Sequence, residues 1–185
     1  MQTRTNGQYG QLAAGAAIGL AAGLALPLAR KALMQAPSAA TGDWAEALKA
    51  EHRLVEKAFE AALATTEDDV MKRDMLLAKI AYALTKHAIQ EENVIYPAMM
   101  QHGQQDQARA LIEDHGRIKT FIFELRNIDA GDVMWRSTLQ GFYDDLRTHI
   151  REEEDVIFPA FHAALPEAES ARLTAMMNWE GFKVA

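Results

Sequence analysis

After residue 43, apolar residues recur at helical spacing along most of the chain, with almost no strand-like alternation. Polar or glycine-containing breaks interrupt the pattern at residues 65–69, 103–106 and 129–132. The pattern predicts four long helices, at residues 43–64, 68–101, 104–128 and 132–162. Short connections join antiparallel neighbours, so we expect an all-α protein with an up-down-up-down four-helix bundle.

The ends of these helices carry recognisable signals. Asp43, after Thr41 and Gly42, can cap the start of the first helix. Pro97 and Pro159 are expected to kink or end the second and fourth helices. A proline also suits the first turn of a helix, so Pro166 predicts a short C-terminal helix. Its expected packing face consists of Leu173, Met176 and Met177.

The first 41 residues differ from the rest in composition. Residues 12–29 carry no charge and are rich in Ala and Gly, and Arg30 and Lys31 follow at once. A helix of this length reaches roughly 27 Å, slightly less than the ~30 Å hydrocarbon core of a bilayer. Basic residues after an apolar run keep the downstream domain in the cytoplasm. We therefore predict membrane association through residues 12–29, with the bundle on the cytoplasmic side of the inner membrane.

Two alternatives stay open for this segment. It can be a cleaved signal peptide with a cleavage site at residues 38–40, which gives an exported protein, or a soluble oligomerisation or disordered segment of a cytoplasmic one. Gly15, Gly19 and Gly23 fall every fourth residue and offer a face for a homo-oligomer, although composition alone produces such spacing. We divide the chain into an N-terminal segment (1–41), a bundle (42–165) and a C-terminal helix and tail (166–185).

Composition then restricts the chemistry. Cysteine is absent, so disulfides, cysteine nucleophiles and thiolate metal sites are excluded, and any metal must be held by nitrogen and oxygen atoms. Beyond residue 41 the chain carries 16 basic and 26 acidic side chains. A domain this acidic is repelled by phosphate backbones, and no basic patch with interleaved aromatics is present, so we expect no nucleic-acid binding.

Histidines and glutamates interrupt the apolar stripes of the four helices. A buried glutamate is costly unless a cation compensates its charge. Each of the two glutamates follows a histidine by four residues, so each pair can point one nitrogen and one carboxylate at the same space. Residues equidistant from a turn lie side by side in antiparallel helices, which brings the whole set to one level. The predicted metal ligands are His52, His87, Glu91, His115, His149 and Glu153.

The two halves of the bundle also resemble each other in sequence. The segment from His87 to Ala98 matches that from His149 to Ala160 at an offset of 62, and His52 and His115 are 63 apart. This indicates a duplicated helical hairpin with a pseudo-twofold axis, which suits two metal ions. Imidazole and carboxylate without sulfur favour Fe, Mn or Zn, and carboxylates near the axis can bridge two ions, which favours di-iron over a single structural zinc.

Simpler interpretations apply to some of these residues. A single histidine on an apolar stripe is more often a hydrogen-bonded core residue than a ligand, and the case for metal comes from six such groups at matching heights. His102 and His162 fall outside the repeat, and we expect them on the surface. Glu154 can replace Glu153 as a ligand, although the repeat favours Glu153.

These residues resemble the hemerythrin-like (HHE cation-binding) family, in the order His52, His87-x-x-x-Glu91, His115, His149-x-x-x-Glu153. The resemblance covers about residues 43–163. It implies a non-heme di-iron centre with four terminal histidines, in which Glu91, Glu153 and an oxo or hydroxo group bridge the two Fe ions. The ferritin-like di-iron proteins instead use Glu-x-x-His, a spacing that none of these histidines has.

One position departs from the family. Oxygen-carrying hemerythrins have a further histidine one turn after the third-helix histidine, where this chain has Lys119. About ten of the twelve positions of two octahedral ions are then filled, which leaves two open. This weakens the case for reversible oxygen carriage and favours binding of oxygen, peroxide or nitric oxide, or slow redox chemistry. Lys119 either faces solvent or places its ammonium near a bound anion.

Three functions follow as hypotheses. The first is a di-iron protein that binds, senses or buffers oxygen, nitric oxide or iron. The second is a di-iron oxidoreductase acting on peroxide or nitric oxide, or an iron donor in metal-centre repair, although nothing in the sequence defines a pocket for an organic substrate. The third is a structural or interaction module whose polar centre holds zinc or nothing.

Overall fold

The computed structural model describes residues 26, 27, 29–33, 35 and 39–185 of the chain. Within the described residues the regular elements are all helical, which confirms the predicted all-α class. From residue 44 onward they are α2 (Trp44–Leu63), α3 (Val70–Gln90), η1 (Glu91–Ile95), α4 (Tyr96–Gln101), α5 (Gln105–Asn127), α6 (Val133–Glu152), η2 (Glu153–Ile157), α7 (Phe158–Ala164) and α8 (Glu167–Val184).

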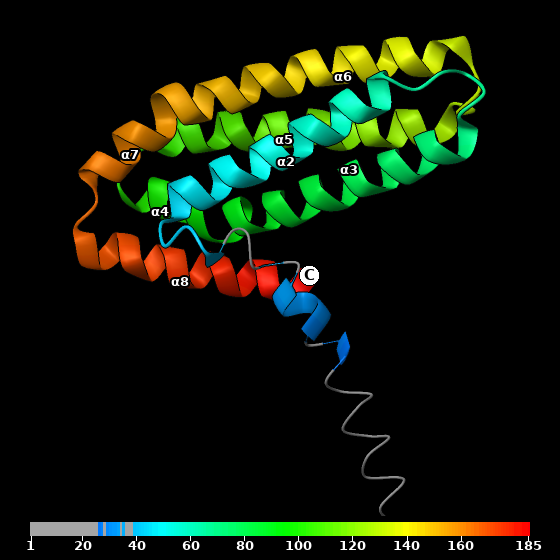
Figure 1. Cartoon of the computed structure of the whole chain (residues 1–185). Coiled ribbons are helices and arrows are strands. Elements are labelled where there is room, and N and C mark those ends of the chain that lie inside the picture. Colours follow the sequence, from blue (N-terminus) through cyan, green and yellow to red (C-terminus); the bar gives the residue numbers. More distant parts are fainter. Residues whose placement is uncertain (1–25, 28, 34, 36–38) are drawn as a thin grey trace, which may run out of the picture.

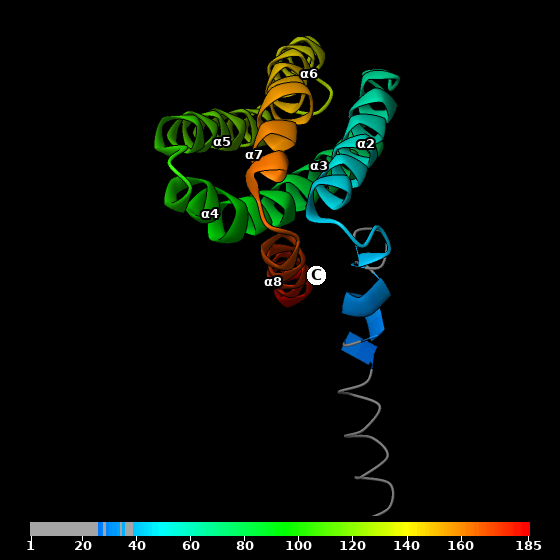
Figure 2. The same cartoon turned by 90° about the vertical axis from the view of Figure 1, so that its left-hand side faces the viewer.

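Four long helical rods lie side by side along one direction, and the chain reverses direction at each of the three connections between them (Figure 1). The rods are α2, α3–η1–α4, α5 and α6–η2–α7. Helix α2 contacts α3 and α6, and α5 contacts the same two helices, so the four surround a common interior. The view turned by 90° shows this grouping from one end, with α8 beneath it (Figure 2).

The rods start and end within two residues of the predicted positions, because local signals define them. The Asp43 carboxylate accepts hydrogen bonds from the backbone N–H groups of Ala45 and Glu46, which caps α2 as expected. Asp132 caps α6 in the same way, by accepting from the N–H of Met134.

Pro97 and Pro159 do not end their helices. Each proline lies two residues past a π-helical segment, η1 or η2, after which the α-helix continues. In η1 the N–H of Tyr96 donates to the carbonyl of Glu91, five residues earlier. The wider turn accommodates the proline, which lacks an N–H and would clash with the preceding turn of a regular helix. The expected interruption is thus a π-helical segment, and such segments are frequent at functional sites.

Helix α8 begins directly after Pro166, as predicted, but at 18 residues it is not short. It lies along the outside of the bundle and contacts α2, α3 and η1. Leu173 and Met177 are buried against the bundle, whereas Met176 is 42% exposed, so its predicted place on the packing face is wrong. The buried face continues instead to Gly181, because residues spaced by four stay in line along a helix.

The interior contains two separate apolar clusters. One lies toward the connections α2–α3 and α5–α6 and includes Phe59, Leu84 and Leu146. The other lies toward α4, α7 and α8 and includes Trp44, Tyr96 and Phe158. On each rod the predicted polar site residues lie where the members of one cluster give way to those of the other. The bundle therefore consists of two apolar layers with a polar layer between them.

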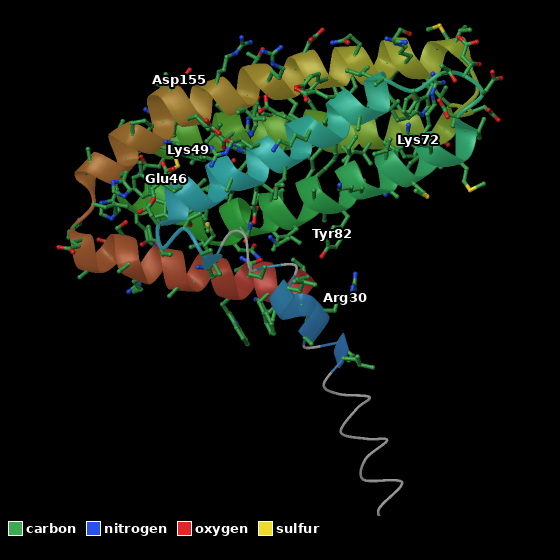
Figure 3. The ribbon with its side chains drawn as sticks, in the orientation of Figure 1. Arg30, Glu46, Lys49, Lys72, Tyr82 and Asp155 are labelled. Atoms are coloured by element: carbon green, nitrogen blue, oxygen red, sulfur yellow. The ribbon has the colours of Figure 1, made fainter. Side chains whose placement is uncertain are left out.

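The predictions for residues 12–29, including the glycine face, lie almost entirely outside the described residues. In the part of the chain that the structure describes, no helix is both long and apolar enough to cross a membrane. Lys31 donates hydrogen bonds to the backbone carbonyls of Phe182 and Lys183 at the end of α8. The hydroxyl of Tyr82, which is labelled on α3 in Figure 3, donates to the carbonyl of Val184 in the same segment. The cellular location and the division of the chain at residues 41 and 165 stay predictions.

Candidate metal centre

The structure brings all six predicted ligands together inside the bundle. Each is at most 5% exposed, and both glutamates are fully buried. His52 comes from α2, His115 from α5, and the two His–Glu pairs lie at the junctions of α3 with η1 and of α6 with η2. The start of each π-helical segment thus coincides with a glutamate of the site.

One half of the site is formed by His52 and His87. Their Nε2 atoms face each other across 2.9 Å. The His87 Nε2 lies 3.2 Å from Oε1 of Glu91, and the His52 Nε2 lies 3.3 Å from Oε2 of Glu153. Four donor atoms, one from each of these side chains, lie within 4.8 Å of one another, which is close enough to share one cation.

The other half is formed by His115 and His149. The His115 Nε2 lies 3.2 Å from Oε2 of Glu91, and the His149 Nε2 lies 3.4 Å from Oε2 of Glu153. These two histidines and Glu153 form a second group with donor atoms within 4.8 Å. Glu91 reaches one histidine of each half through its two oxygens, and Glu153 belongs to both groups. The carboxylates therefore lie between the two histidine pairs.

The outward-facing nitrogen of every site histidine is next to an acid. The Nδ1 atoms lie 2.8 to 3.3 Å from carboxylate oxygens, in the pairs His52–Glu154, His87–Glu51, His115–Glu92 and His149–Asp114. A carboxylate accepts a hydrogen bond from the Nδ1–H group. In a neutral ring the proton then stays on Nδ1, and the lone pair on Nε2 faces the centre. We call these four acids the outer acids.

This arrangement fits a cation. In neutral rings oriented by the outer acids, the Nε2 atoms of His52 and His87 present two lone pairs to each other with no proton between them. Three further buried site atoms have no hydrogen-bond partner, namely Oε1 of Glu91, Nε2 of His149 and Oε2 of Glu153. Most buried polar side-chain atoms in folded proteins have a hydrogen-bond partner. Nitrogen and oxygen donors of this kind suit iron, manganese or zinc.

Without a metal, protons take part of that role. Burial alone would lower the pKa of His87, but the Glu91 and Glu51 carboxylates outweigh it and raise that pKa well above its usual value. Burial would raise the pKa of Glu91, but His87 and His115 hold it well below its usual range. Burial would also raise the pKa of Glu51, but His87 and Lys86 lower it to about 2. The site therefore attracts positive charge.

The remaining predictions near the site are resolved as follows. Glu154 lies on the outer Nδ1 of His52 and not at the centre, which agrees with the repeat in favouring Glu153. The ammonium of Lys119 is 2.8 Å from Glu92, and its side chain is 61% exposed, although the residue also forms part of the wall of a cavity beside the site. His102 and His162 are exposed, as expected, and pair with Glu169 and Asp43.

Sequence reasoning missed Tyr96. Its ring is fully buried, and its hydroxyl lies 2.9 Å from Oε1 of Glu153, 3.2 Å from Oε2 of Glu91 and 3.1 Å from Nε2 of His115. Burial and the two carboxylates raise its pKa well above the usual value, so the phenol is a hydrogen-bond donor in the metal-free protein. No signal in the sequence indicated Tyr96, because the repeat pairs it with the apolar Phe158.

Two cavities adjoin the site. A cavity of about 30 Å³ is lined by all four site histidines and by apolar side chains that include Leu84, Ile118 and Leu146. This volume holds a molecule of two or three atoms, since one water needs roughly 10–15 Å³. A larger pocket of about 170 Å³ lies between α2 and α3 and is lined by His52, His87 and mostly apolar neighbours.

Comparison with known proteins agrees with this geometry. Searches of curated proteins and of solved structures found no match. The family model described as the hemerythrin HHE cation binding domain matches residues 44–161, which run from the start of α2 into α7 and include all six candidate ligands. The chain therefore belongs to the hemerythrin HHE cation-binding domain family.

Proposed function

We propose that this protein holds two iron ions as a non-heme di-iron centre in an up-down-up-down bundle and that the centre binds a small ligand such as oxygen, nitric oxide or peroxide. The observation that carries the proposal is the inward orientation of four Nε2 atoms around two buried carboxylates, each histidine being oriented by an outer acid. A hydrogen-bonded apolar core has no need of this arrangement, whereas metal-binding histidines usually have such partners.

The number of ions follows from the two histidine pairs. His52 with His87 would hold one ion, and His115 with His149 would hold the other. Glu91 would bridge them, because its two oxygens lie 3.2 Å from Nε2 atoms of different pairs. Glu153 would act as the second bridge, as the glutamate common to both groups. Iron is favoured over zinc because bridging carboxylates suit a redox-active pair of metal ions.

The size of the smaller cavity supports a diatomic or triatomic ligand. Apart from the four histidines, Thr85 and Lys119, the residues that line it are apolar, so it favours small neutral molecules. The leading function is therefore to bind, sense or buffer such a molecule. A di-iron oxidoreductase acting on peroxide or nitric oxide is the second candidate, and the larger pocket beside His52 and His87 favours it, because it gives a reactant a second approach to the same histidines.

Metal analysis tests the proposal. The full chain is loaded anaerobically with ferrous iron, freed of excess metal and analysed for iron per chain, with two as the expected value. His87→Leu and His149→Leu, one from each half, should each lose iron. His102→Leu is the matched control, because that histidine is exposed, lies outside the site and pairs with Glu169. One metal or none in the unmodified protein, or full iron content in both site variants, would overturn the proposal.

Stopped-flow mixing separates the two candidate functions. The diferrous protein is mixed with oxygen, nitric oxide or peroxide while absorbance and consumption of the reactant are followed. A binding protein forms one stable adduct per centre. An oxidoreductase consumes many equivalents when a reductant is supplied.

A further inference from the structure

We propose that Tyr96 is a further ligand of the centre, an oxygen donor to the metal ion held by His115 and His149. This inference rests on the proposed function, because it needs metal in the site. It makes the two metal ions inequivalent, although the two hairpins that hold them are repeats of one another.

The distances around the hydroxyl carry the argument. Atoms that bind one ion at about 2.1 Å and at right angles to each other lie about 3 Å apart. The Tyr96 hydroxyl lies 2.9 to 3.2 Å from one atom of Glu153, of His115 and of Glu91. These atoms come from three different helical rods, so the hydroxyl completes a cluster of donors and does not simply pair with one neighbour.

The repeat shows that the hydroxyl is specific to one half. The position equivalent to Tyr96 is Phe158, which is fully buried and whose ring is parallel to that of His52 at 6.4 Å. Tyr96 likewise lies beside His115, with ring centroids 5.4 Å apart and the ring planes tilted by 44°. Both positions therefore place an aromatic ring beside a site histidine, but only Tyr96 adds an oxygen atom. Packing alone is satisfied by phenylalanine at this position.

The position of Tyr96 also assigns the side from which a small ligand binds. Tyr96 belongs to the apolar cluster toward α4, α7 and α8. The 30 Å³ cavity lies on the opposite side of the polar layer, because its apolar walls, Leu84 and Ile118 among them, belong to the other cluster. Tyr96 therefore binds on the side of the centre away from this cavity and leaves the cavity side, lined by all four histidines, open to a small ligand.

Spectroscopy of the iron-loaded, air-oxidised full chain tests this assignment. When the Tyr96 oxygen bonds to ferric iron, the phenol O–H bond breaks and its proton leaves to water. A phenolate bound to ferric iron gives a visible charge-transfer band, and excitation in that band enhances the ring modes of the phenolate in the Raman spectrum. We expect both features in the unmodified protein and expect ring-deuterated tyrosine to shift the Raman modes.

Tyr96→Phe reproduces the side chain of the equivalent Phe158 and should abolish the band while the protein retains two irons. Tyr143→Phe and Tyr82→Phe are matched controls, because their hydroxyls approach Glu60 and the carbonyl of Val184 instead of the site. Both controls should keep the band.

The outcomes separate this inference from the proposed function. Unmodified protein that binds no iron contradicts the proposed function itself. Two irons without a phenolate band in the unmodified protein, or a band that persists in Tyr96→Phe, overturns the assignment of Tyr96 alone. If Tyr96→Phe fails to fold, the isotope shift in the unmodified protein decides, since only a coordinated ring gives it.

Discussion

Glu51 and His87 contact each other across the interface of α2 and α3, with Oε2 of Glu51 3.2 Å from Nδ1 of His87. Glu51 is the sequence neighbour of His52, yet it orients the histidine of the next helix. Lys86 and Gln90 donate to the same carboxylate, each at 2.6 Å. Glu51 is therefore a fixed anionic acceptor that holds the His87 ring with its Nε2 toward the site.

Replacing Glu51 by alanine should weaken iron binding. His87 would lose the acceptor of its Nδ1 proton, and loss of such a partner typically lowers metal affinity roughly 10–100-fold. Competition with a chromophoric chelator measures the change. Glu46→Ala is the matched control, because Glu46 lies on the same helix but is exposed and pairs with Lys49. Equal affinities for the two variants would contradict the role given to Glu51.

The metal-free protein should lose stability as the pH rises above about 6.5. The pKa of His87 is raised in the folded state, so its contribution is complete below the unfolded value of 6.5 and disappears as the pH rises through the folded pKa. The pKa of Glu91 is lowered, so its contribution is present above 4.5 and disappears as the pH falls through its folded pKa. Between these limits both groups stabilise the fold.

Urea unfolding of the metal-free chain between pH 5 and 9 measures this dependence. His87→Leu should flatten the decline above pH 6.5, since it removes the titrating ring. Iron affinity should change in the opposite direction and rise with pH, because metal must displace protons from the histidines. Metal-free protein whose stability increases from pH 6.5 to 9 would contradict the expected sign.

Replacing Lys119 by alanine should leave anion binding almost unchanged. The Lys119 ammonium pairs with Glu92 at the surface, and such exposed pairs contribute about 0–1 kcal/mol. Azide binding to the ferric protein is the measurement, and we expect less than about a fivefold change. Glu92→Ala, which removes the acceptor of His115 Nδ1, should instead weaken iron binding. A large loss of azide affinity in Lys119→Ala would place the ammonium beside the bound anion after all.

The positions of the rods and the meeting of the six site residues could be predicted, because both depend on regular features. Helical periodicity places His52 and His87 on buried stripes, and the spacing of the turns sets their heights. The identity of hydrogen-bond partners could not be predicted in this way. Glu51 precedes His52 but contacts His87, since the choice depends on how α2 and α3 are rotated about their axes.

The role of Tyr96 escaped prediction for a related reason. The repeat predicts site residues from polar side chains that occur in both halves. It matches Tyr96 with Phe158, which has no hydroxyl, so it does not indicate a role for the Tyr96 oxygen. The π-helical segments were missed too, because a proline in a helix signals an interruption without specifying its form. Met176 was misplaced because periodicity gives the width of an apolar face only roughly, and here the face continues to Gly181.

Arg73 should prove important for stability but not for metal binding. It is 1% exposed, and it donates to the hydroxyl of Thr65 at 2.9 Å and to the carbonyl of Ala130 at 2.6 Å. Its guanidinium also lies 4.8 Å from the ring centroid of Trp135. Arg73 thus joins the turn after α2 to the turn before α6, at the end of the bundle where the two hairpins meet.

Arg73→Met should lower the free energy of unfolding by about 2–4 kcal/mol, because it leaves the buried Ala130 carbonyl without this donor and removes the contact with Trp135. Urea denaturation measures the change, with Lys72→Met as the matched control on the exposed side of the same helix (Figure 3). Both variants should retain two irons, since the site lies in the polar layer between the apolar clusters and not at this end. A loss below about 1 kcal/mol would mean that apolar packing alone holds the two hairpins together.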